Sequence, residues 1–368
     1  MPTAAFDYPF PAGLVARHPP ARRGDSRLMV VDRRSGELTD RTFESLAELF
    51  PPRDLLVVND SRVFPARLRG RKPTGARAEL LLLRPVGGSA APAASGGGAG
   101  LGGSGRDAGS DDASPRTWEA LVRPGGKLKP GRRVGVADGF EVLILESLPG
   151  GRRLVRLEGD RDPWTLIRRH GQVPLPPYLG REAEAADRER YQTVYARRRG
   201  SVAAPTAGLH FTRELLDRLR QREVEIVPLT LHVGVGTFRP VQAARPSEHR
   251  LHPERYRVEP AAAEAVNAAR RRGARVWAVG TTVVRVLETL AGEDGTVRPG
   301  SGWTELFIHP PYEFRIVDRL LTNFHLPRSS LLMLVCAFGG RELILRAYGR
   351  AVRDRYRFYS YGDAMLVR

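Results

Sequence analysis

The sequence contains one cysteine, three lysines and no long apolar run. The single cysteine, Cys336, excludes an intramolecular disulfide and any zinc site built from several thiolates. The longest apolar run, residues 331–338, is far shorter than the roughly 20 residues that a membrane-spanning helix needs. The first residues also lack the basic and apolar segments of a secretory signal. We therefore expect a cytoplasmic protein with no membrane partner.

Basic residues outnumber acidic residues by 59 to 41, which gives a formal net charge of +18 and a pI near 10.9. Such a surplus favours a polyanionic partner, because each neutralised phosphate releases condensed counterions. Compositional bias explains why nearly all the basic residues are arginine, but it does not explain their excess over acids. The charge therefore predicts a nucleic-acid partner.

Residues 87–115 consist almost entirely of glycine, alanine and serine with a few charges. This segment cannot bury enough apolar surface to offset its ordering entropy, so a disordered loop is predicted. Around it lie short apolar runs separated by Gly and Pro turns, at residues 78–83, 118–122, 141–146 and 152–157. This pattern predicts a small antiparallel barrel or sandwich over residues 65–160.

The flanking parts, residues 1–64 and 161–368, alternate strand and helix patterns. Buried strands are expected at residues 28–32 and 55–59, with a helix at 42–50 between them. A helix from Thr212 leads into a strand at 224–233, and the pattern continues as helix 261–272, strand 275–279 and helix 282–290. Such alternation predicts an α/β domain with a mainly parallel, helix-covered sheet, into which the β module is inserted.

Four segments of the α/β part carry residues suited to chemistry. In residues 202–212, Pro205 and Gly208 oppose regular structure, and Thr206 to His210 approach the amino terminus of a helix. The alternative is a tight loop with a structural histidine. In residues 230–238, a strand delivers His232 to a turn that contains Gly234, Gly236 and Thr237. A β-bulge is the alternative there, and a dinucleotide site is not inferred because the third glycine is missing.

The third segment, residues 276–288, runs from a strand through Gly280, Thr281 and Thr282 into a helix. Free N–H groups, two hydroxyls and Arg285 one turn later favour a site for an anion or carboxylate, with ordinary helix capping as the alternative. The fourth segment joins Asn323 and His325 with the aromatic residues near the carboxyl terminus. Tyr359 and Tyr361 could stack on a base, or they could simply pack in the core.

Two basic stretches, residues 62–72 and 123–133, are candidates for phosphate contacts, with a solvated surface as the alternative. His249 and His252 are spaced as H-x-x-H, but no acidic residue or further histidine stands at a useful distance. No metal site is therefore predicted.

The order of these segments resembles the S-adenosylmethionine:tRNA ribosyltransferase-isomerase family, known as QueA. The resemblance rests on AAPTAGLHFT (203–212), LHVGVGTFRPV (231–241), AVGTTVVRVLE (278–288), TNFHLP (322–327) and YRFYSYGDAML (356–366). The amino-terminal half agrees through DLLVVNDSRVFPARLRGRK (54–72), GQVPLPPYLGR (171–181) and DRERYQTVY (187–195). It covers the chain except residues 87–115.

The resemblance implies a three-layer α/β/α domain with an inserted small antiparallel β-barrel. It also implies an enzyme of queuosine biosynthesis that transfers and isomerises the ribosyl part of S-adenosylmethionine. The acceptor is 7-aminomethyl-7-deazaguanine at the wobble position of tRNA, and the products are epoxyqueuosine, adenine and methionine. S-adenosylmethionine is then a substrate, no permanently bound cofactor is expected, and we expect a monomer.

This reaction begins with removal of a C5′ proton beside the sulfonium and needs an acid or hydrogen bond for the departing adenine. The expected acid/base residues are His210, His232 and His325, with Asp60 and Asp363 in reserve. Gly280, Thr281, Thr282 and Arg285 are expected to bind the methionine carboxylate. The other expected substrate-binding residues are Thr206, Gly208, Gly234, Gly236, Thr237, Asn323 and Tyr361, and the expected phosphate contacts are Arg62, Arg67, Lys127 and Lys129.

Three residues depart from the family pattern: Val283 and Cys336 replace hydroxyl residues, and Pro311 replaces glycine. Val283 is expected to weaken a polar contact at the Gly280–Thr282 site. Two alternatives to the family reaction stay open. A paralogue could use the same donor on another acceptor, or the chain could be a non-catalytic RNA-binding protein.

Overall fold

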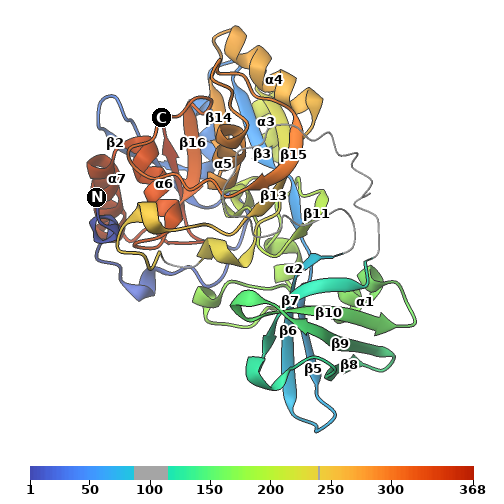
Figure 1. Ribbon diagram of the computed structural model, residues 1–368. Coiled ribbons are helices and arrows are strands. Elements are labelled where there is room, and N and C mark those ends of the chain that lie inside the picture. Colours follow the sequence, from blue (N-terminus) through green and yellow to red (C-terminus); the bar gives the residue numbers. More distant parts are fainter. Residues whose placement is uncertain (87–114, 239–240) are drawn as a thin grey trace. The chain divides into compact units, whose positions relative to one another are not determined.

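The computed structural model describes residues 1–86, 115–238 and 241–368 and divides the chain into two compact units (Figure 1). One unit comprises Met1–Val63 and Leu175–Arg368, and the other comprises Phe64–Pro174. The loop predicted at residues 87–115 falls, except for its last residue, outside the described residues.

The first unit is built on one nine-stranded sheet with the order β15-β13-β12-β3-β14-β16-β17-β1-β2. These strands are β1 (Arg27–Val31), β2 (Leu38–Thr42), β3 (Leu55–Asn59), β12 (Glu225–Leu231), β13 (Glu254–Val258), β14 (Val276–Val279), β15 (Gly300–Thr304), β16 (Arg319–Asn323) and β17 (Ala364–Val367). Parallel pairing joins β12, β3, β14 and β16, and also β17 and β1. The other four pairings are antiparallel, so half of the pairings are parallel and the sheet is mixed, whereas a mainly parallel sheet was predicted. Short connections, such as the turn from β1 to β2, do not allow the crossover that parallel strands need.

Alternate residues of the strands enter two different apolar cores, because successive side chains of a strand point to opposite faces. On β1, Met29 and Val31 join one core, whereas Leu28 and Val30 join the other. The first core is closed by α4 (Pro260–Arg271), α5 (Thr281–Thr289), α6 (Ser330–Gly339) and α7 (Arg341–Arg353). The second is closed by α3 (Arg213–Gln221) and the 3-10 helix Phe43–Leu49. The unit is therefore a three-layer α/β/α sandwich, as predicted.

The local patterns predict most element positions. α3 begins after Thr212, whose hydroxyl accepts a hydrogen bond from the Leu215 N–H at 3.1 Å, and its Leu215, Leu216 and Leu219 are buried. The segment predicted as a helix at 42–50 is a 3-10 helix, Phe43–Leu49. The strand predicted at 224–233 ends at Leu231, so His232 and the glycines after it leave the sheet.

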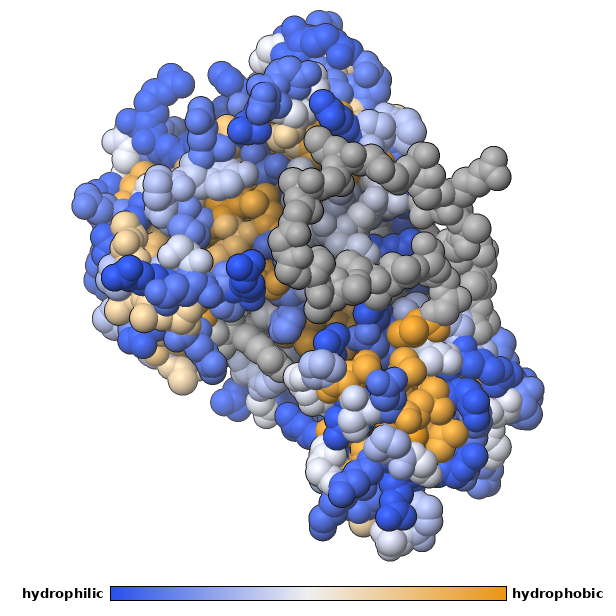
Figure 2. Space-filling view, in the orientation of Figure 1, coloured by the Kyte–Doolittle hydropathy of each residue, from blue (hydrophilic) through white to orange (hydrophobic). Residues whose placement is uncertain are grey.

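The second unit contains a closed barrel with the order β10-β7-β6-β5-β8-β9, in which all neighbours are antiparallel. Its strands are β5 (Arg67–Arg71), β6 (Arg77–Pro85), β7 (Thr117–Arg123), β8 (Arg133–Ala137), β9 (Phe140–Ser147) and β10 (Arg152–Gly159). Inward residues such as Val142 and Ile144 are fully buried, whereas outward Leu143 and Leu145 are only partly buried. Figure 2 accordingly shows hydrophobic residues among hydrophilic ones on the visible face of the barrel.

The barrel unit ends at Pro174, beyond the boundary predicted at residue 160. The reason is α1 (Pro163–His170), which packs on the barrel. Its Trp164 ring meets the rings of Trp118 and Phe64 edge-on, with centroids 5.2 and 5.6 Å apart. Burial of these aromatic rings binds the helix to the barrel rather than to the sheet unit.

The sheet unit also contains α2 (Asp187–Arg190), several 3-10 helices, and a parallel pair of short strands, β4 (Ser61–Val63) and β11 (Arg198–Ser201). Among the described residues, no helix is both long and apolar enough to cross a membrane.

Candidate functional site

The candidate site lies at one edge of the large sheet. Because β3, β12, β14 and β16 are parallel, they all end at this edge, which we call the carboxyl edge. β17 runs antiparallel to β16 and parallel to β1, so these two strands begin there. The topology thus places Asp60, His232, Gly280, Asn323 and Asp363 at the same edge. Ligands of open α/β sheets commonly bind outside the carboxyl ends of the strands.

His210 is held in a buried hydrogen-bond network at this edge. Its Nδ1 lies 2.8 Å from Ser26 Oγ, and its Nε2 lies 3.0 Å from the amide nitrogen of Asn323. The same amide nitrogen donates to the Tyr359 carbonyl at 3.1 Å, which fixes the orientation of the Asn323 amide. His210 Nε2 must therefore be the acceptor, and Nδ1 carries the proton and donates to Ser26.

Burial, assisted by the nearby Arg23 guanidinium, lowers the pKa of His210 to about 3. The ring also stacks on Phe43, with centroids 4.9 Å apart. A small pocket lined by Arg23, Ser26, His210 and Tyr361 reaches the ring, but its volume of about 10 Å³ is that of about one water molecule. His210 is neutral at pH 7, and both its nitrogens have partners.

His325 has a similar environment. Its Nε2 lies 2.8 Å from the Thr322 hydroxyl, and burial lowers its pKa to about 3. Its backbone N–H donates to the Tyr348 hydroxyl at 2.9 Å, and its carbonyl accepts a hydrogen bond from the Tyr8 hydroxyl. These contacts anchor the segment after β16, and burial leaves His325 neutral at pH 7.

His232 is the histidine of the three that is not fully buried. It follows β12 directly, and its N–H donates to the Arg255 carbonyl at 2.9 Å. Its ring lies against Gly200, where a Cβ atom would come within 2.7 Å of Nδ1 and Cε1. The absence of a side chain at Gly200 therefore leaves room for the His232 ring at the carboxyl edge.

Asn59 and Asp60 form a second polar group, at the end of β3. The Asn59 amide donates to the Leu231 carbonyl at 3.0 Å and to the Thr282 hydroxyl at 3.3 Å, which ties β3, β12 and α5 together. Asp60 accepts from the Thr230 hydroxyl at 2.5 Å and lies 3.3 Å from Arg197, while burial raises its pKa. Asn59 is not among the residues predicted from the sequence, although two polar residues directly after the apolar run 55–58 were a usable signal.

Gly280 caps α5 with φ +87°, a left-handed conformation that favours glycine. Thr281 and Thr282 follow in the first turn and are both buried. Arg285, expected to bind a substrate carboxylate, instead forms a buried ion pair with Glu254. Its Nε donates to the Leu306 carbonyl at 2.9 Å, so the chain itself supplies the partners of this guanidinium.

In the other two segments, Gly208 and Gly236 stand where a neighbouring side chain leaves no room for a Cβ atom. The segment Thr206–His210 is a 3-10 helix rather than an irregular loop. A Cβ atom on Gly208 would lie 2.1 Å from the Tyr195 hydroxyl, so only glycine fits there. The Gly234 N–H donates to Glu254 at 2.8 Å, and Gly236 lies against His252. The side chain of Thr237 lies outside what the structure describes.

The aromatic residues near the carboxyl terminus are part of the core. The Tyr361 hydroxyl donates to Asp187 at 2.8 Å, and Tyr359 packs against Phe10 and Tyr178. Both rings are buried, which matches the core-packing alternative and leaves no exposed face for a base. Asp363 accepts hydrogen bonds from the backbone N–H groups of Arg27 and Arg357, at 2.9 and 2.7 Å. It thus ties the start of β1 to the segment that precedes β17.

The four residues predicted to contact phosphate belong to different units. Arg62 is an exposed residue of β4 in the sheet unit. In the barrel unit, Lys127 and Lys129 are exposed on either side of buried Leu128, whereas Arg67 lies near Glu79. The sequence of the barrel unit, residues 64–174, contains 19 arginines and lysines and 11 acids, a net charge of +8.

The three departures from the family pattern make no hydrogen bond with His210, His232 or His325 within the described residues. Val283 and Cys336 are buried among apolar side chains of the first core, and Pro311 follows a cis peptide bond. No group of three or more His, Cys, Asp or Glu residues in the described part of the chain is arranged to hold a metal ion.

Comparisons with known proteins cover the whole chain. A family model described as "Queuosine biosynthesis protein" matches residues 3–367. The chain is 50% identical to the S-adenosylmethionine:tRNA ribosyltransferase-isomerase of Symbiobacterium thermophilum and 47% identical to that of Geobacter sulfurreducens, each over 100% of both chains. It is also similar to the crystal structure of S-adenosylmethionine tRNA ribosyltransferase from Thermotoga maritima, with 34% identity, a TM-score of 0.53 and coverage of 99% of this chain and 100% of that one. The chain belongs to the queuosine biosynthesis protein family.

Proposed function

We propose that this protein is an S-adenosylmethionine:tRNA ribosyltransferase-isomerase. It transfers and isomerises the ribosyl group of S-adenosylmethionine onto 7-aminomethyl-7-deazaguanine in tRNA and releases adenine and methionine. The observation that carries the proposal is the end-to-end match to relatives of that name, at up to 50% identity among those described above. The convergence of the matching segments on one sheet edge supports it.

The reaction needs a base for the C5′ proton, and His232 is our candidate. A base works best when its pKa lies near the working pH, whereas burial lowers the pKa values of His210 and His325 to about 3. His232 is the one of the three that solvent reaches. Asp60 is the reserve candidate, because burial raises the pKa of its carboxyl group toward the range of a useful base.

His210 and His325 serve in this proposal as positioning residues. His210 links Ser26, before β1, to Asn323, at the end of β16. His325 links the segment after β16 to Thr322. Both keep the carboxyl edge in one conformation, which preorganisation of a reaction site requires.

The start of α5 is our candidate for the methionine carboxylate, through the N–H groups of its first turn rather than through Arg285. Helix amino termini favour anions because these N–H groups have no partner within the helix. The bond from Asn59 to the Thr282 hydroxyl supports this role by orienting that hydroxyl at the helix start.

Contacts to tRNA phosphates are assigned in this proposal to the barrel, with Lys127 and Lys129 as the first candidates. The net charge of +8 over residues 64–174 supports a polyanionic partner, and both lysines are exposed. The variant Lys127→Ala/Lys129→Ala is expected to raise the KM for tRNA without lowering kcat. It should also reduce the salt dependence of tRNA binding, by about one unit of slope for each lysine that neutralises a phosphate.

The decisive experiment is mass analysis of nucleosides from tRNA that carries 7-aminomethyl-7-deazaguanine, after incubation with the protein and S-adenosylmethionine. Appearance of epoxyqueuosine supports the proposal. Consumption of S-adenosylmethionine without modified tRNA would indicate a paralogue with another acceptor. A folded protein that binds RNA but not S-adenosylmethionine would be a non-catalytic RNA-binding protein.

The role of His232 is tested by adenine release from His232→Ala, with the exposed His18→Ala as the matched control. Loss of a general base typically lowers kcat by about 10²–10⁴-fold, whereas the control should retain wild-type release. His210→Ala belongs in the same series. If both His210→Ala and His232→Ala release adenine at the wild-type rate, histidine acid/base catalysis is wrong.

A further inference from the structure

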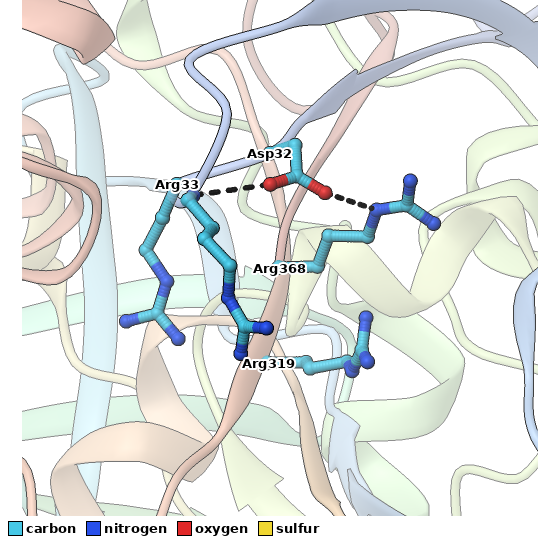
Figure 3. Close-up of a pocket in the computed structure, with 5 residues that line it drawn as sticks. Asp32, Arg33, Arg319 and Arg368 are labelled. Carbon is cyan, nitrogen blue, oxygen red and sulfur yellow. Dashed lines mark hydrogen bonds and ion pairs between the residues drawn. The ribbon is translucent and has the colours of Figure 1, made fainter.

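A second concave feature of the sheet unit lies at the edge opposite the candidate site. It is a pocket of about 490 Å³ lined by Asp32, Arg33, Arg34, Arg319 and Arg368, which we call the arginine pocket (Figure 3). Asp32 and Arg33 follow the last residue of β1, Arg368 follows β17, and Arg319 begins β16. None of the functions assigned above uses these residues.

Of the four arginines in the described lining of the arginine pocket, Arg368 is the one that forms an ion pair with a carboxylate. Arg368 Nε lies 3.1 Å from Asp32, the one acidic side chain of the lining. Within the described part of the chain, Arg33, Arg34 and Arg319 have no ion pair with a carboxylate. The lining side chains therefore carry four positive charges and one negative charge.

Other contacts hold two of these guanidinium groups in place. Arg33 donates to the carbonyls of Phe338 and Asp318, at 3.0 and 2.8 Å, and its guanidinium carbon lies 4.2 Å from the centre of the Phe338 ring. The guanidinium carbon of Arg319 lies 5.0 Å from the centre of the buried Trp277 ring. Carbonyls and aromatic faces orient an arginine without neutralising it, so both groups stay available to an anion.

The charges in the arginine pocket repel one another. Burial lowers the pKa of Arg319; Asp54 and Asp318 raise this pKa, whereas Arg368 and Arg275 lower it. Burial also lowers the pKa of Arg33, and Arg319 lowers it too, whereas Asp318 and Asp32 raise it. An anion bound among these groups would remove the repulsion.

We propose that the arginine pocket binds phosphate groups, either those of an RNA backbone or those of a free phosphate ester. The planar guanidinium group matches phosphate through paired hydrogen bonds, and several arginines around one concavity suit a ligand with more than one negative charge. The volume lies within the range of pockets that hold small ligands. The RNA version rests on the proposed function, and the free-ester version does not.

The test measures binding to the full chain by calorimetry, with two probes. Sodium pyrophosphate stands for a free ester, and an unmodified RNA hairpin stands for the backbone. Arg34→Glu is the first variant, because Arg34 is exposed and its side chain makes no hydrogen bond or ion pair within the described residues. Arg319→Gln is the second, since it removes a charge inside the pocket. The matched control is Arg41→Glu, an exposed arginine on β2, at the other end of the β1–β2 hairpin.

We expect both pocket variants to bind at least one probe about tenfold more weakly than the wild type, as removal of one charged hydrogen-bond donor implies. The control should bind both probes as the wild type does. Weaker binding of pyrophosphate indicates a free phosphate ester as the ligand, and weaker binding of the hairpin indicates an RNA backbone. Equal binding of both probes by all four proteins would overturn the proposal. An equal loss in Arg41→Glu would also overturn it, because net charge alone would then explain the effect. The assay involves no turnover, so its failure is distinct from failure of the proposed reaction.

Discussion

The Nε2 atom of His210 accepts a hydrogen bond from the side-chain amide of Asn323, 3.0 Å away, although the two residues are 113 positions apart in the sequence. The contact joins the segment before α3 to the end of β16. Since Ser26 holds the other nitrogen, the histidine is fixed in one tautomer. A histidine fixed in this way holds the surrounding segments in one arrangement. Its Nε2 atom can bind a proton only after the hydrogen bond from Asn323 is broken.

Replacement of Asn323 by aspartate should raise the pKa of His210 from about 3. The carboxylate presents an acceptor where the amide presented a donor, so Nε2 must be protonated to keep the hydrogen bond. The titration of the imidazole C–H signals by NMR measures this shift. Asn267→Asp, on α4, is the control and should leave His210 unchanged. An unshifted His210 in Asn323→Asp would show that the amide does not face Nε2.

Stability should fall as the pH falls, because His210 and His325 are buried as neutral groups. Their folded pKa values of about 3 lie below the unfolded value near 6.5, so between these values the unfolded chain binds protons that the folded chain does not. The stability that the neutral side chains of His210 and His325 contribute is fully present above pH 6.5. It is lost as the pH falls toward 3. From pH 7 to pH 5, each histidine should lower the free energy of unfolding by about 2 kcal/mol.

Urea unfolding at the two pH values measures this effect. His210→Gln and His325→Gln should each lose less stability on acidification than the wild type, because glutamine does not titrate. Subtracting the loss of stability in a variant from that in the wild type removes the contribution of Asp60, Asp363 and other titrating groups that both proteins share. A wild type and variants with the same pH dependence would contradict the assignment of neutral, buried histidines.

Substitution of Gly208 by alanine should lower the free energy of unfolding by about 1–3 kcal/mol, because the new Cβ atom would overlap the Tyr195 hydroxyl. Thermal unfolding of the purified variant measures the loss. Gly13→Ala is the control, since a Cβ atom there meets nothing within 4 Å. The double variant Gly208→Ala/Tyr195→Phe should recover part of the stability. No recovery would mean that Thr193, 2.8 Å from the same Cβ position, dominates the clash.

Replacement of Glu254 by glutamine should cost about 3–5 kcal/mol of unfolding free energy, because it leaves the Arg285 charge buried without its partner. Removal of both charges in Glu254→Leu/Arg285→Met should cost less than the single change. Urea unfolding of the two variants gives the comparison. If the double variant is the less stable one, the attraction between Arg285 and Glu254 stabilises the fold by more than the desolvation of the two charges destabilises it.

The sequence alone predicts the parts of this protein that depend on local physics. The apolar runs at residues 28–32 and 55–59 form buried strands, since four or five apolar residues in a row can be buried on both faces of a sheet. Thr212 starts a helix because its hydroxyl satisfies a free N–H group. The family follows from the order of the motifs, and the three-layer architecture with its barrel follows from the family.

Strands whose outward positions carry charge are harder to recognise. β5 (Arg67–Arg71) has the sequence RLRGR, which looks like a basic surface stretch. In the closed barrel, however, Leu68 points inward and the charged residues lie at the alternate positions. One inward apolar side chain in five residues leaves too weak an alternation for a strand to be predicted from the sequence, because the other inward position is Gly70.

The partners of the polar residues were decided only by the tertiary structure. The sequence selects Arg285 and His210 as candidates, but it cannot show that Glu254 pairs with the first and that Ser26 and Asn323 hold the second. These contacts depend on strand order and on the direction of β16 relative to β17. Both are set by packing between segments far apart in the chain, where each contact gains energy only after all of its neighbours are in place.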